Sequence, residues 1–330
     1  MKYTTLSNTD IKLSSVTLGC MTFTGDSNWG PQDEKDSIET IRAALDAGIV
    51  SFDTAEGYAD GLSDRILGKA LGADRSKVSI LTKLHTARMD KNSVIASCEA
   101  SLKNLNTDYI DLYQIHWPSA TIPLEETMEQ LLKLKEQGKI RAIGVSNFGV
   151  EDLGYAIDKY ADVVSNQIAY NMLFRGAEYS LLPFCEKNNI SVLTYSSLAQ
   201  GLLSGKYLTA DDFPMGRART KIFNSKIRTG ARHGGEGCEE IAFKAIDDVR
   251  NICKEIGEDM ADVALAWSLA QPGITSVIAG GRTAEQALTN AKGGNLELAP
   301  DVIKALCDAT NAVKEFIGDD VDPWDYGRIK

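Results

Sequence analysis

Short runs of β-branched and other apolar residues recur along this chain, and amphipathic helical stretches fill the gaps between them. Several runs are apolar on both alternations, which is typical of parallel strands buried on both faces. We expect strands at Val16–Cys20, Val50–Asp53, Val78–Lys83, Tyr109–His116, Ile140–Val145, Val163–Ile168, Ile190–Tyr195 and Ile274–Ala279. The first residues of the first seven strands follow one another at spacings that each fit one strand–helix unit, and the last gap is much longer.

The pattern predicts a (β/α)8 TIM barrel made of residues 1–330 as one domain, because no Pro- or Ser-rich segment divides the chain. A doubly wound sheet is the alternative, but the first strand is not followed by a G-x-G-x-x-G turn. Lys2–Leu6 and Ile11–Leu13 predict an N-terminal β-hairpin. The long gap between strands seven and eight predicts a Gly- and Arg-rich loop, Gly201–Gly237, followed by two helices.

Charge and composition limit the classes of binding partner and the cellular location that we expect for this chain. The chain has 35 Lys and Arg against 46 Asp and Glu, so its net charge is −11, and we expect neither nucleic acid nor a membrane as a partner. No apolar stretch is long enough for a signal peptide or a membrane span, which favours a cytoplasmic protein. Six scattered cysteines without a C-x-x-C pair, and only three histidines, predict neither disulfides nor a metal site. The oligomeric state is left open.

Polar residues follow almost every predicted strand, always at its carboxyl end. Asp53 and Tyr58 follow the second strand, Lys83 the third, and His116 with Trp117 the fourth. Barrel enzymes place their active sites at this end, so we expect a functional site there. Each residue has a simpler interpretation. Asp53 could cap a loop, Lys83 could reach solvent, Tyr58 could pack in a loop, and His116 could be a satisfied strand-end histidine.

The four residues nevertheless form a coherent chemical set. A tyrosine with a pKa near 10 is a poor acid at neutral pH. A lysine ammonium beside its hydroxyl stabilises the phenolate and lowers that pKa, and a carboxylate holds the lysine charged and oriented. A histidine can share the hydrogen bond to a substrate oxygen. Together they would make a general acid for a carbonyl oxygen.

The segments that carry these residues resemble the aldo-keto reductase family, in the bacterial branch that also resembles the potassium-channel β-subunits. The matching motifs are LGCMTF, FDTAEGYADG, LTKLH, DYIDLYQIHWP, IRAIGVSNF, NQIAYN, YSSLAQGLLSGKY and GGRTAEQALTN. The resemblance implies a (β/α)8 barrel that binds a nicotinamide cofactor without a Rossmann fold. It places the catalytic tetrad on Asp53, Tyr58, Lys83 and His116, with direct hydride transfer to a carbonyl carbon.

The same resemblance implies a set of cofactor contacts. They run from the nicotinamide ribose through the carboxamide and pyrophosphate to the adenosine end: Gly19, Cys20, Met21, Asp53, Ser146, Asn147, Gln167, Tyr195, Ser196, Leu198, Gln200, Gly201, Ser204, Lys206, Arg219, Gly280, Arg282, Gln286 and Asn290. Tyr195 would stack on the nicotinamide ring. Because a guanidinium binds phosphate bidentately, Arg282 favours NADP(H), with NAD(H) as the alternative. Arg217 and Arg219 would close over the cofactor, unless that loop is only a solvated basic patch.

Two departures from the family pattern concern the cofactor site. Ser197 stands where the family usually has proline, and the adenosine motif reads GGR where GAR or GSS is common. Neither change removes a polar contact, so they bear on cofactor affinity more than on activity. The chain also lacks the long C-terminal loop of the steroid and aldose reductase branch.

The substrate pocket would be formed by Trp29, Tyr58, His116 and Trp117, with Asn171, Phe174 and Arg175 as further candidates. The tail aromatics Trp324 and Tyr326 either close over it or pack at the surface. We therefore expect an oxidoreductase that reduces aldehydes or ketones, or oxidises the matching alcohol or sugar. One alternative is a cofactor-sensing regulatory subunit with little turnover. Another is a Schiff-base aldolase using Lys83, which the neighbouring Asp53 disfavours because it keeps the amine charged.

Overall fold

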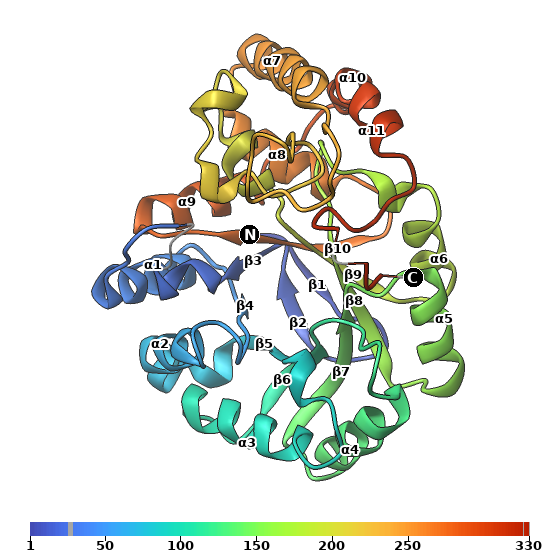
Figure 1. Cartoon of the computed structure of the whole chain (residues 1–330). Coiled ribbons are helices and arrows are strands. Elements are labelled where there is room, and N and C mark those ends of the chain that lie inside the picture. The colour runs from blue at the N-terminus through green and yellow to red at the C-terminus, as the bar shows by residue number, and fades with distance from the viewer. Residues whose placement is uncertain (26–28, 326, 330) are drawn as a thin grey trace.

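A closed barrel of parallel strands forms the centre of the computed structural model, which describes residues 1–25, 29–325 and 327–329 (Figure 1). Its strands are β3 (Val16–Gly19), β4 (Ser51–Asp53), β5 (Ser79–Leu84), β6 (Ile110–Ile115), β7 (Ile140–Ser146), β8 (Val163–Ala169), β9 (Ser191–Tyr195) and β10 (Ile274–Gly280). They follow one another in chain order, and β10 pairs with β3 to close the ring. The predicted barrel is confirmed, and each predicted strand boundary lies within one residue of the observed one.

Helices surround the barrel, and most of them lie against the outer faces of the strands (Figure 1). They are α1 (Glu34–Asp46), α2 (Leu62–Leu71), α3 (Val94–Leu105), α4 (Leu124–Glu136), α5 (Val150–Lys159), α6 (Leu181–Lys187), α7 (Glu239–Ile256), α8 (Met260–Leu269), α9 (Ala284–Gly293), α10 (Pro300–Ala309) and α11 (Asn311–Ile317). Their apolar stripes face inward; α4, for example, buries Met128, Leu131 and Leu134. None of the described helices is long and apolar enough to cross a bilayer.

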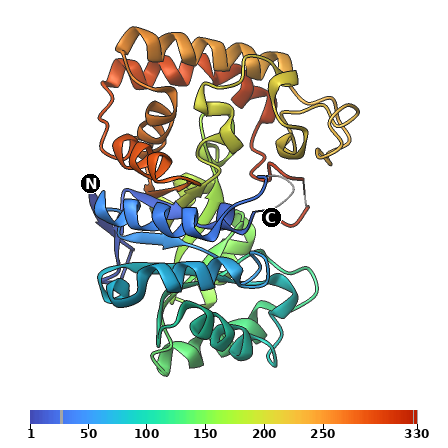
Figure 2. The same ribbon diagram turned by 90° about the vertical axis from the view of Figure 1, so that its left-hand side faces the viewer.

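The predicted hairpin plugs one end of the barrel. It consists of β1 (Tyr3–Thr5) and β2 (Lys12–Ser14). Leu6, Ile11 and Leu13 are fully buried there and form one cluster with side chains from inside the barrel: Leu81, Leu112, Ala142, Val164, Leu193 and Ile278. Figure 2 shows the hairpin and the long loop after β9 at opposite ends of the molecule.

The other end of the barrel, which we call the mouth, is formed by the carboxyl ends of the strands and the loops that follow them. The long loop before α7 lies over one side of the mouth (Figure 2). The tail that follows α11 returns to this loop: the Lys221 backbone N–H donates to the Pro323 carbonyl at 3.0 Å, and the Lys221 ammonium pairs with Asp320 and Asp325. Loop and tail are therefore connected where they lie over one side of the mouth.

Candidate active site

The structure brings the four predicted catalytic residues together at the mouth. Lys83, on β5, donates from Nζ to Asp53 Oδ1 at 2.5 Å and contacts the Tyr58 hydroxyl at 3.4 Å. The Tyr58 ring meets the His116 ring edge-on, with 5.9 Å between centroids. Asp53 ends β4 and His116 directly follows β6, so neighbouring parallel strands deliver these side chains to one point.

Lys83 and Asp53 form a buried ion pair. Their side chains are only 1% and 5% exposed, and the second Asp53 oxygen accepts from Gln167 Nε2 at 2.7 Å. The Lys83 ammonium also donates to the Thr54 carbonyl at 2.8 Å. Although burial lowers the pKa of Lys83, Asp53 and Tyr58 together raise it above its ordinary value, so the amine is a fixed ammonium.

The expected lowering of the Tyr58 pKa is not what the structure shows. Burial raises the pKa of Tyr58 above its ordinary value, and the Lys83 ammonium opposes that effect only in part, while the Asp53 carboxylate adds to it. The Asp53 carboxylate, which anchors Lys83, also repels a phenolate on Tyr58. In this state Tyr58 is a protonated hydroxyl at neutral pH, which is the form that a proton donor needs.

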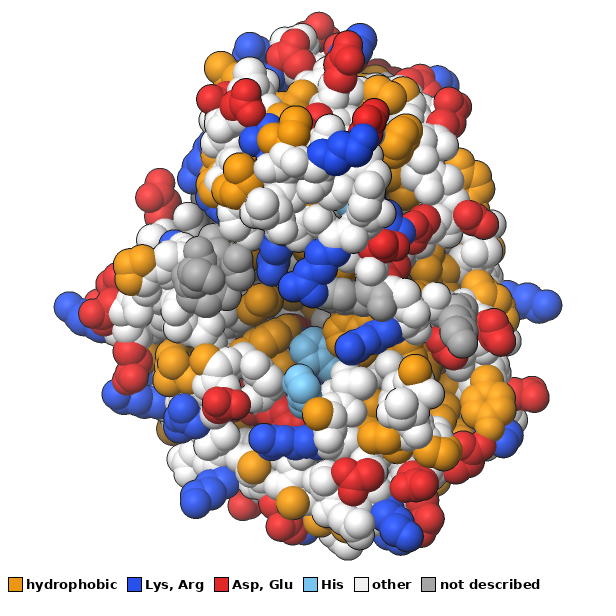
Figure 3. All heavy atoms as spheres, in the orientation of Figure 1, with side chains coloured by type: hydrophobic (Ala, Val, Ile, Leu, Met, Phe, Trp, Pro, Cys, Tyr) orange, Lys and Arg blue, Asp and Glu red, His pale blue; other side chains and the backbone are white. Residues whose placement is uncertain are grey.

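His116 is neutral in this environment. Burial, together with the nearby Lys83 and His85, lowers the pKa of His116 well below its ordinary value. Its backbone carbonyl accepts from Asn147 Nδ2 at 3.0 Å, which ties the end of β6 to the end of β7. Figure 3 shows this face hollowed near its centre, with histidine side chains in the hollow and Lys and Arg side chains gathered above it. A neutral imidazole there can donate or accept a hydrogen bond.

The residues predicted to hold a carboxamide also converge. Ser146 Oγ donates to the Gln167 carbonyl, and Asn147 Nδ2 donates to Ser146 Oγ. The Tyr195 hydroxyl donates to Asn147 Oδ1 at 2.7 Å. Gln167 in turn reaches Asp53, so this cluster and the tetrad form one continuous network. The structure therefore places the predicted amide cluster beside the predicted proton donor.

The loop after β9 has a backbone suited to anions. Ser196 has a positive φ, and Ala199, Gln200 and Gly201 have positive φ in succession within η5 (Ala199–Ser204). A right-handed residue followed by a left-handed one, as at Leu198 and Ala199, can turn neighbouring N–H groups toward one side and form an anion-binding concavity. The Ala199 and Gly201 N–H groups donate to the Ser196 and Leu198 carbonyls, so the other N–H groups of the segment would have to bind the anion. Leu198 and Ser204 bracket this segment, and Lys206 lies exposed beyond it.

Two loop arginines extend this concavity. Arg217 donates from Nη1 to the Gln200 carbonyl and from Nη2 to the Tyr207 hydroxyl. Arg219 lies over the Trp324 ring, 5.5 Å from its centroid. Among the described residues, the buried Nε atoms of both arginines have no hydrogen-bond partner. Buried cationic donors with unused capacity beside an anion-binding backbone fit a diphosphate-bearing cofactor.

The predicted adenosine end is built differently from the expectation. Gly280 ends β10, beside Gly19 of β3, and its carbonyl accepts from Asn290 of α9. Arg282 does not extend away from the loops: its guanidinium donates to Gln32 Oε1 and to the carbonyls of Trp29 and Pro31, and its backbone N–H donates to Gln286 Oε1. In this state Arg282 anchors the loop after β3.

Gly19, Cys20 and Met21, the residues predicted to contact the nicotinamide ribose, lie at the carboxyl end of β3 and directly after it. The Cys20 N–H donates to the Asp53 carbonyl at 2.8 Å, and Cys20 is buried, while Met21 is 37% exposed at the mouth. A Cβ on Gly19 would lie 3.1 Å from an Ile278 methyl, so the end of β3 is packed closely against β10.

Comparison with known proteins follows from this geometry. The sequence profile described as "Aldo/keto reductase family" matches residues 15–311, nearly the whole barrel. The chain belongs to the aldo/keto reductase family. This confirms the resemblance predicted from the motifs, and it makes the chain a member of a family of carbonyl and alcohol oxidoreductases.

Several relatives of this aldo/keto reductase have been named. It is 37% identical to aldo-keto reductase YhdN of Bacillus subtilis, over 86% of this chain and 85% of that protein. It is 33% identical to the NADH-specific methylglyoxal reductase of Escherichia coli, over 91% and 95%. It is 31% identical to a Schizosaccharomyces pombe protein named as a candidate voltage-gated potassium-channel β-subunit, over 93% and 92%. The crystal structure of a Klebsiella pneumoniae aldo-keto reductase with NADPH has a TM-score of 0.73, at 28% identity over 93% and 94%.

The aromatic residues predicted to line the substrate pocket of this aldo/keto reductase lie around the mouth. Trp29 lies near the Arg217 guanidinium, 5.6 Å from its ring centroid, and Trp117 follows His116 at the mouth. Asn171, Phe174 and Trp324 line a narrow cavity between the β8 and β9 loops, the long loop and the tail. The structure thus places Trp324 at the mouth as expected, whereas Tyr326 lies outside the described residues.

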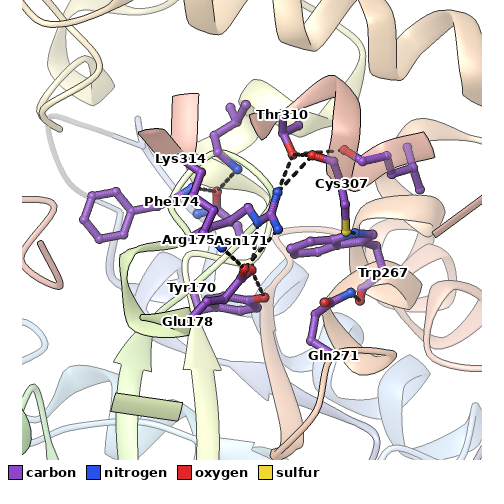
Figure 4. Close-up of polar contacts among 12 residues, drawn as sticks. Tyr170, Asn171, Phe174, Arg175, Glu178, Trp267, Gln271, Cys307, Thr310 and Lys314 are labelled. Atoms are coloured by element: carbon purple, nitrogen blue, oxygen red, sulfur yellow. Dashed lines mark hydrogen bonds and ion pairs between the residues drawn. The ribbon is translucent and has the colours of Figure 1, made fainter. Parts of the chain in front are cut away.

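Arg175 was a wrong candidate for the pocket. It is 6% exposed and turned away from the mouth, where it pairs with Glu178 and donates to the Cys307 carbonyl and to Thr310 (Figure 4). Lys314 pairs with the same Glu178. Arg175 therefore docks α10 and α11 onto the barrel, and nothing in the sequence distinguishes such an anchor from a pocket arginine.

Two residues near the site were not predicted. The Thr54 carbonyl accepts a hydrogen bond from the Lys83 ammonium, and the Thr54 hydroxyl donates to Asp64 Oδ1 at 2.7 Å. Thr54 stands next to Asp53, and Asp64 lies six positions after Tyr58 in a segment predicted to follow the second strand. The sequence shows an acidic residue shortly after Tyr58, but not that Asp64 is buried, so it held no signal that singled out Asp64.

Proposed function

We propose that this chain is an NADP(H)-dependent oxidoreductase that reduces aldehydes or ketones, or oxidises the matching alcohol or sugar. The observation that carries the proposal is the Lys83 ammonium, which is held between the Asp53 carboxylate and the Tyr58 hydroxyl beside a neutral His116. A fixed ammonium at a phenol, next to a neutral hydrogen-bonding imidazole, suits proton transfer to a carbonyl oxygen.

In the reductive direction, the Tyr58 hydroxyl gives its proton to the substrate oxygen. The Lys83 ammonium stabilises the phenolate that remains, and Asp53 keeps this ammonium oriented. His116 donates a second hydrogen bond that fixes the carbonyl in line with Tyr58. The bound nicotinamide supplies the hydride in reduction and accepts it in oxidation. In oxidation a Tyr58 phenolate would take the alcohol proton. Because the Tyr58 pKa is raised, little phenolate is present at neutral pH, so the oxidative role is less favoured than the reductive one.

The cofactor would lie along the mouth between the two clusters already described. Ser146, Asn147 and Gln167 would hold the carboxamide, and Tyr195 would cover the nicotinamide ring. The left-handed segment of η5 and the two loop arginines would hold the diphosphate. NADPH in the Klebsiella pneumoniae relative supports NADP(H), while the NADH-specific relative keeps NAD(H) as the alternative.

A regulatory subunit that binds the cofactor with little turnover is the second candidate. The similarity to the candidate channel β-subunit supports it. The complete Lys83–Asp53–Tyr58 arrangement favours turnover instead, since a sensor needs no proton donor. The aldolase alternative is disfavoured, because a buried ammonium paired with a carboxylate is a poor nucleophile.

A substrate panel followed by reduced-nicotinamide absorbance tests the proposal. Aldehydes, ketones, aldoses and polyols are offered in both directions, with NADP(H) and NAD(H) compared. Turnover of carbonyl compounds with NADPH is the expected result. Cofactor that binds but is never oxidised by any of these compounds would favour the regulatory subunit, and failure to bind either cofactor would overturn both candidates.

A further inference from the structure

A buried carboxylate stands behind the catalytic cluster. Asp64, in the first turn of α2, is 0% exposed. Three other buried aspartates each pair with a cation: Asp53 with Lys83, Asp111 with Arg75, and Asp262 with Lys292. In the described chain Asp64 has no such ion pair, and the hydroxyl of Thr54 is the donor to its Oδ1. An unpaired buried carboxylate destabilises a fold, so its presence here calls for a role in the site.

A short chain of hydrogen bonds joins Asp64 to the proton donor. Asp64 Oδ1 accepts from Thr54 Oγ1 at 2.7 Å, and the Thr54 carbonyl accepts from Lys83 Nζ at 2.8 Å. Lys83 Nζ then meets the Tyr58 hydroxyl at 3.4 Å. Thr54 is therefore fixed at its side chain by Asp64 while its backbone holds the ammonium.

We propose that Asp64 is a positioning residue: through Thr54 it fixes the Lys83 ammonium against Tyr58, and its own charge tunes how readily Tyr58 gives up its proton. This inference rests on the proposed function. Asp64 touches neither the Tyr58 hydroxyl nor the place of the substrate, so it acts through its neighbours.

The charge of Asp64 changes within an accessible pH range. Burial raises the pKa of Asp64 to about 6, against the opposing effects of hydrogen bonds from Thr54 and Ser101 and of the Lys83 charge. The other titratable groups facing it are Glu56 after β4, Cys20 after β3 and Tyr113 on β6. Protonation of Asp64 would remove a negative charge that acts on the Lys83 ammonium, and this ammonium would then stabilise the Tyr58 phenolate more strongly, so reduction should be faster below this pKa.

The pH profile of reductive kcat tests the charge effect. In the wild type, kcat should rise about threefold as the pH falls through 6, because a neighbouring carboxylate is neutralised. Asp64→Asn keeps an acceptor oxygen but has no charge, so its profile should lack this step. Asp262→Asn, a buried aspartate on α8, and His85→Gln, an exposed imidazole near His116, should both retain it. A step that survives in Asp64→Asn would overturn the proposal.

A double-mutant cycle tests the route through Thr54. Asp64→Ala and Thr54→Val should each lower kcat about tenfold with an unchanged cofactor KM, and the double variant should lose no more than either single one. Losses that multiply would show that Asp64 does not act through Thr54.

A measurement without any ligand keeps this proposal separate from the proposed function. The ionisation of Tyr58 is followed by tyrosinate absorbance, as the difference between a protein and its Tyr58→Phe counterpart. Asp64→Asn should lower the Tyr58 pKa relative to the wild type, and an unchanged Tyr58 pKa would overturn the inference. Absent turnover on the substrate panel would instead overturn the proposed function and leave this result intact.

Discussion

The indole Nε1 of Trp324 donates a 3.1 Å hydrogen bond to the hydroxyl of Tyr195, which itself donates to Asn147 Oδ1 at 2.7 Å. A residue near the carboxyl end of the chain thus orients the aromatic side chain that ends β9. Because Arg219 of the long loop lies over the Trp324 ring, loop and tail meet at this indole.

Replacing Trp324 by phenylalanine tests this link. Trp324→Phe keeps an aromatic ring but removes the N–H, so the Tyr195 ring loses one of its restraints. The dissociation constant for NADPH should rise about threefold, consistent with the loss of one hydrogen bond. Isothermal titration calorimetry measures this directly. Leu288→Ala, an exposed apolar change on α9, serves as the control. Equal affinities of wild type and Trp324→Phe would contradict the link.

Replacing Tyr58 by phenylalanine tests the proton donor. Tyr58→Phe removes the hydroxyl and keeps the ring that packs against His116. Turnover should fall by about 100- to 10,000-fold, the range that general acid catalysis supplies. Cofactor affinity should stay within a factor of about two, because the hydroxyl is assigned to the substrate oxygen. Full turnover in this variant would rule out Tyr58 as the donor.

Replacing Asp53 by asparagine tests the buried ion pair. Asp53→Asn leaves the Lys83 ammonium buried without its carboxylate, so the free energy of unfolding should fall by about 3 kcal/mol or more. Urea denaturation gives this value. The control is Asp308→Asn, which breaks an exposed pair with Lys304 on α10 and should change the unfolding free energy very little. Similar losses in the two variants would argue against a buried pair.

Replacing Arg282 by glutamine separates two roles of this arginine. If Arg282 binds a 2′-phosphate, Arg282→Gln should weaken NADPH binding by about tenfold or more and leave NADH binding nearly unchanged. If it only anchors the loop through Trp29 and Pro31, both cofactors should weaken to the same extent. We expect the first outcome. Parallel titrations with NADPH and NADH distinguish the two.

Replacing Asp64 by asparagine should stabilise the fold above pH 6. The pKa of Asp64 in the folded protein, about 6, is higher than its ordinary value of 3.8, so the carboxyl favours folding only when protonated. The wild type therefore loses stability as the pH rises from about 4 to 6. Asp64→Asn should be more stable by about 2 kcal/mol at pH 7, and this gain should vanish near pH 4. A gain that is independent of pH would contradict a titrating Asp64.

Much of the barrel could be predicted from local sequence. Strands such as Ile190–Tyr195 are apolar on both faces because they are buried on both faces, and the polar residue at each strand end marks the mouth. For this reason Asp53, Lys83 and His116 could be assigned to one site before any contact was known. The Lys83–Asp53 hydrogen bond and the edge-on contact of the His116 ring with Tyr58 show that they lie together.

What could not be predicted depends on packing between distant segments. The sequence cannot distinguish an arginine that lines a pocket from one that anchors a helix. Only the position of α10 and α11 shows that Arg175 faces Glu178 and Thr310. The pKa of Tyr58 depends on a balance of burial against Lys83, and a sequence reveals the charges but not the loss of water around them. The same holds for Asp64, whose burial is set by α2 and its neighbours.

The hairpin at the opposite end of the barrel has a kinetic consequence. Because Leu6, Ile11 and Leu13 fill that end, the cofactor and the substrate of the proposed function would both enter and leave at the mouth. The ligand that binds deeper in the site would have to bind first and dissociate last. A fixed order of binding and dissociation would thus follow from the filled end of the barrel. The slowest dissociation past the loop and tail would then limit the rate of turnover.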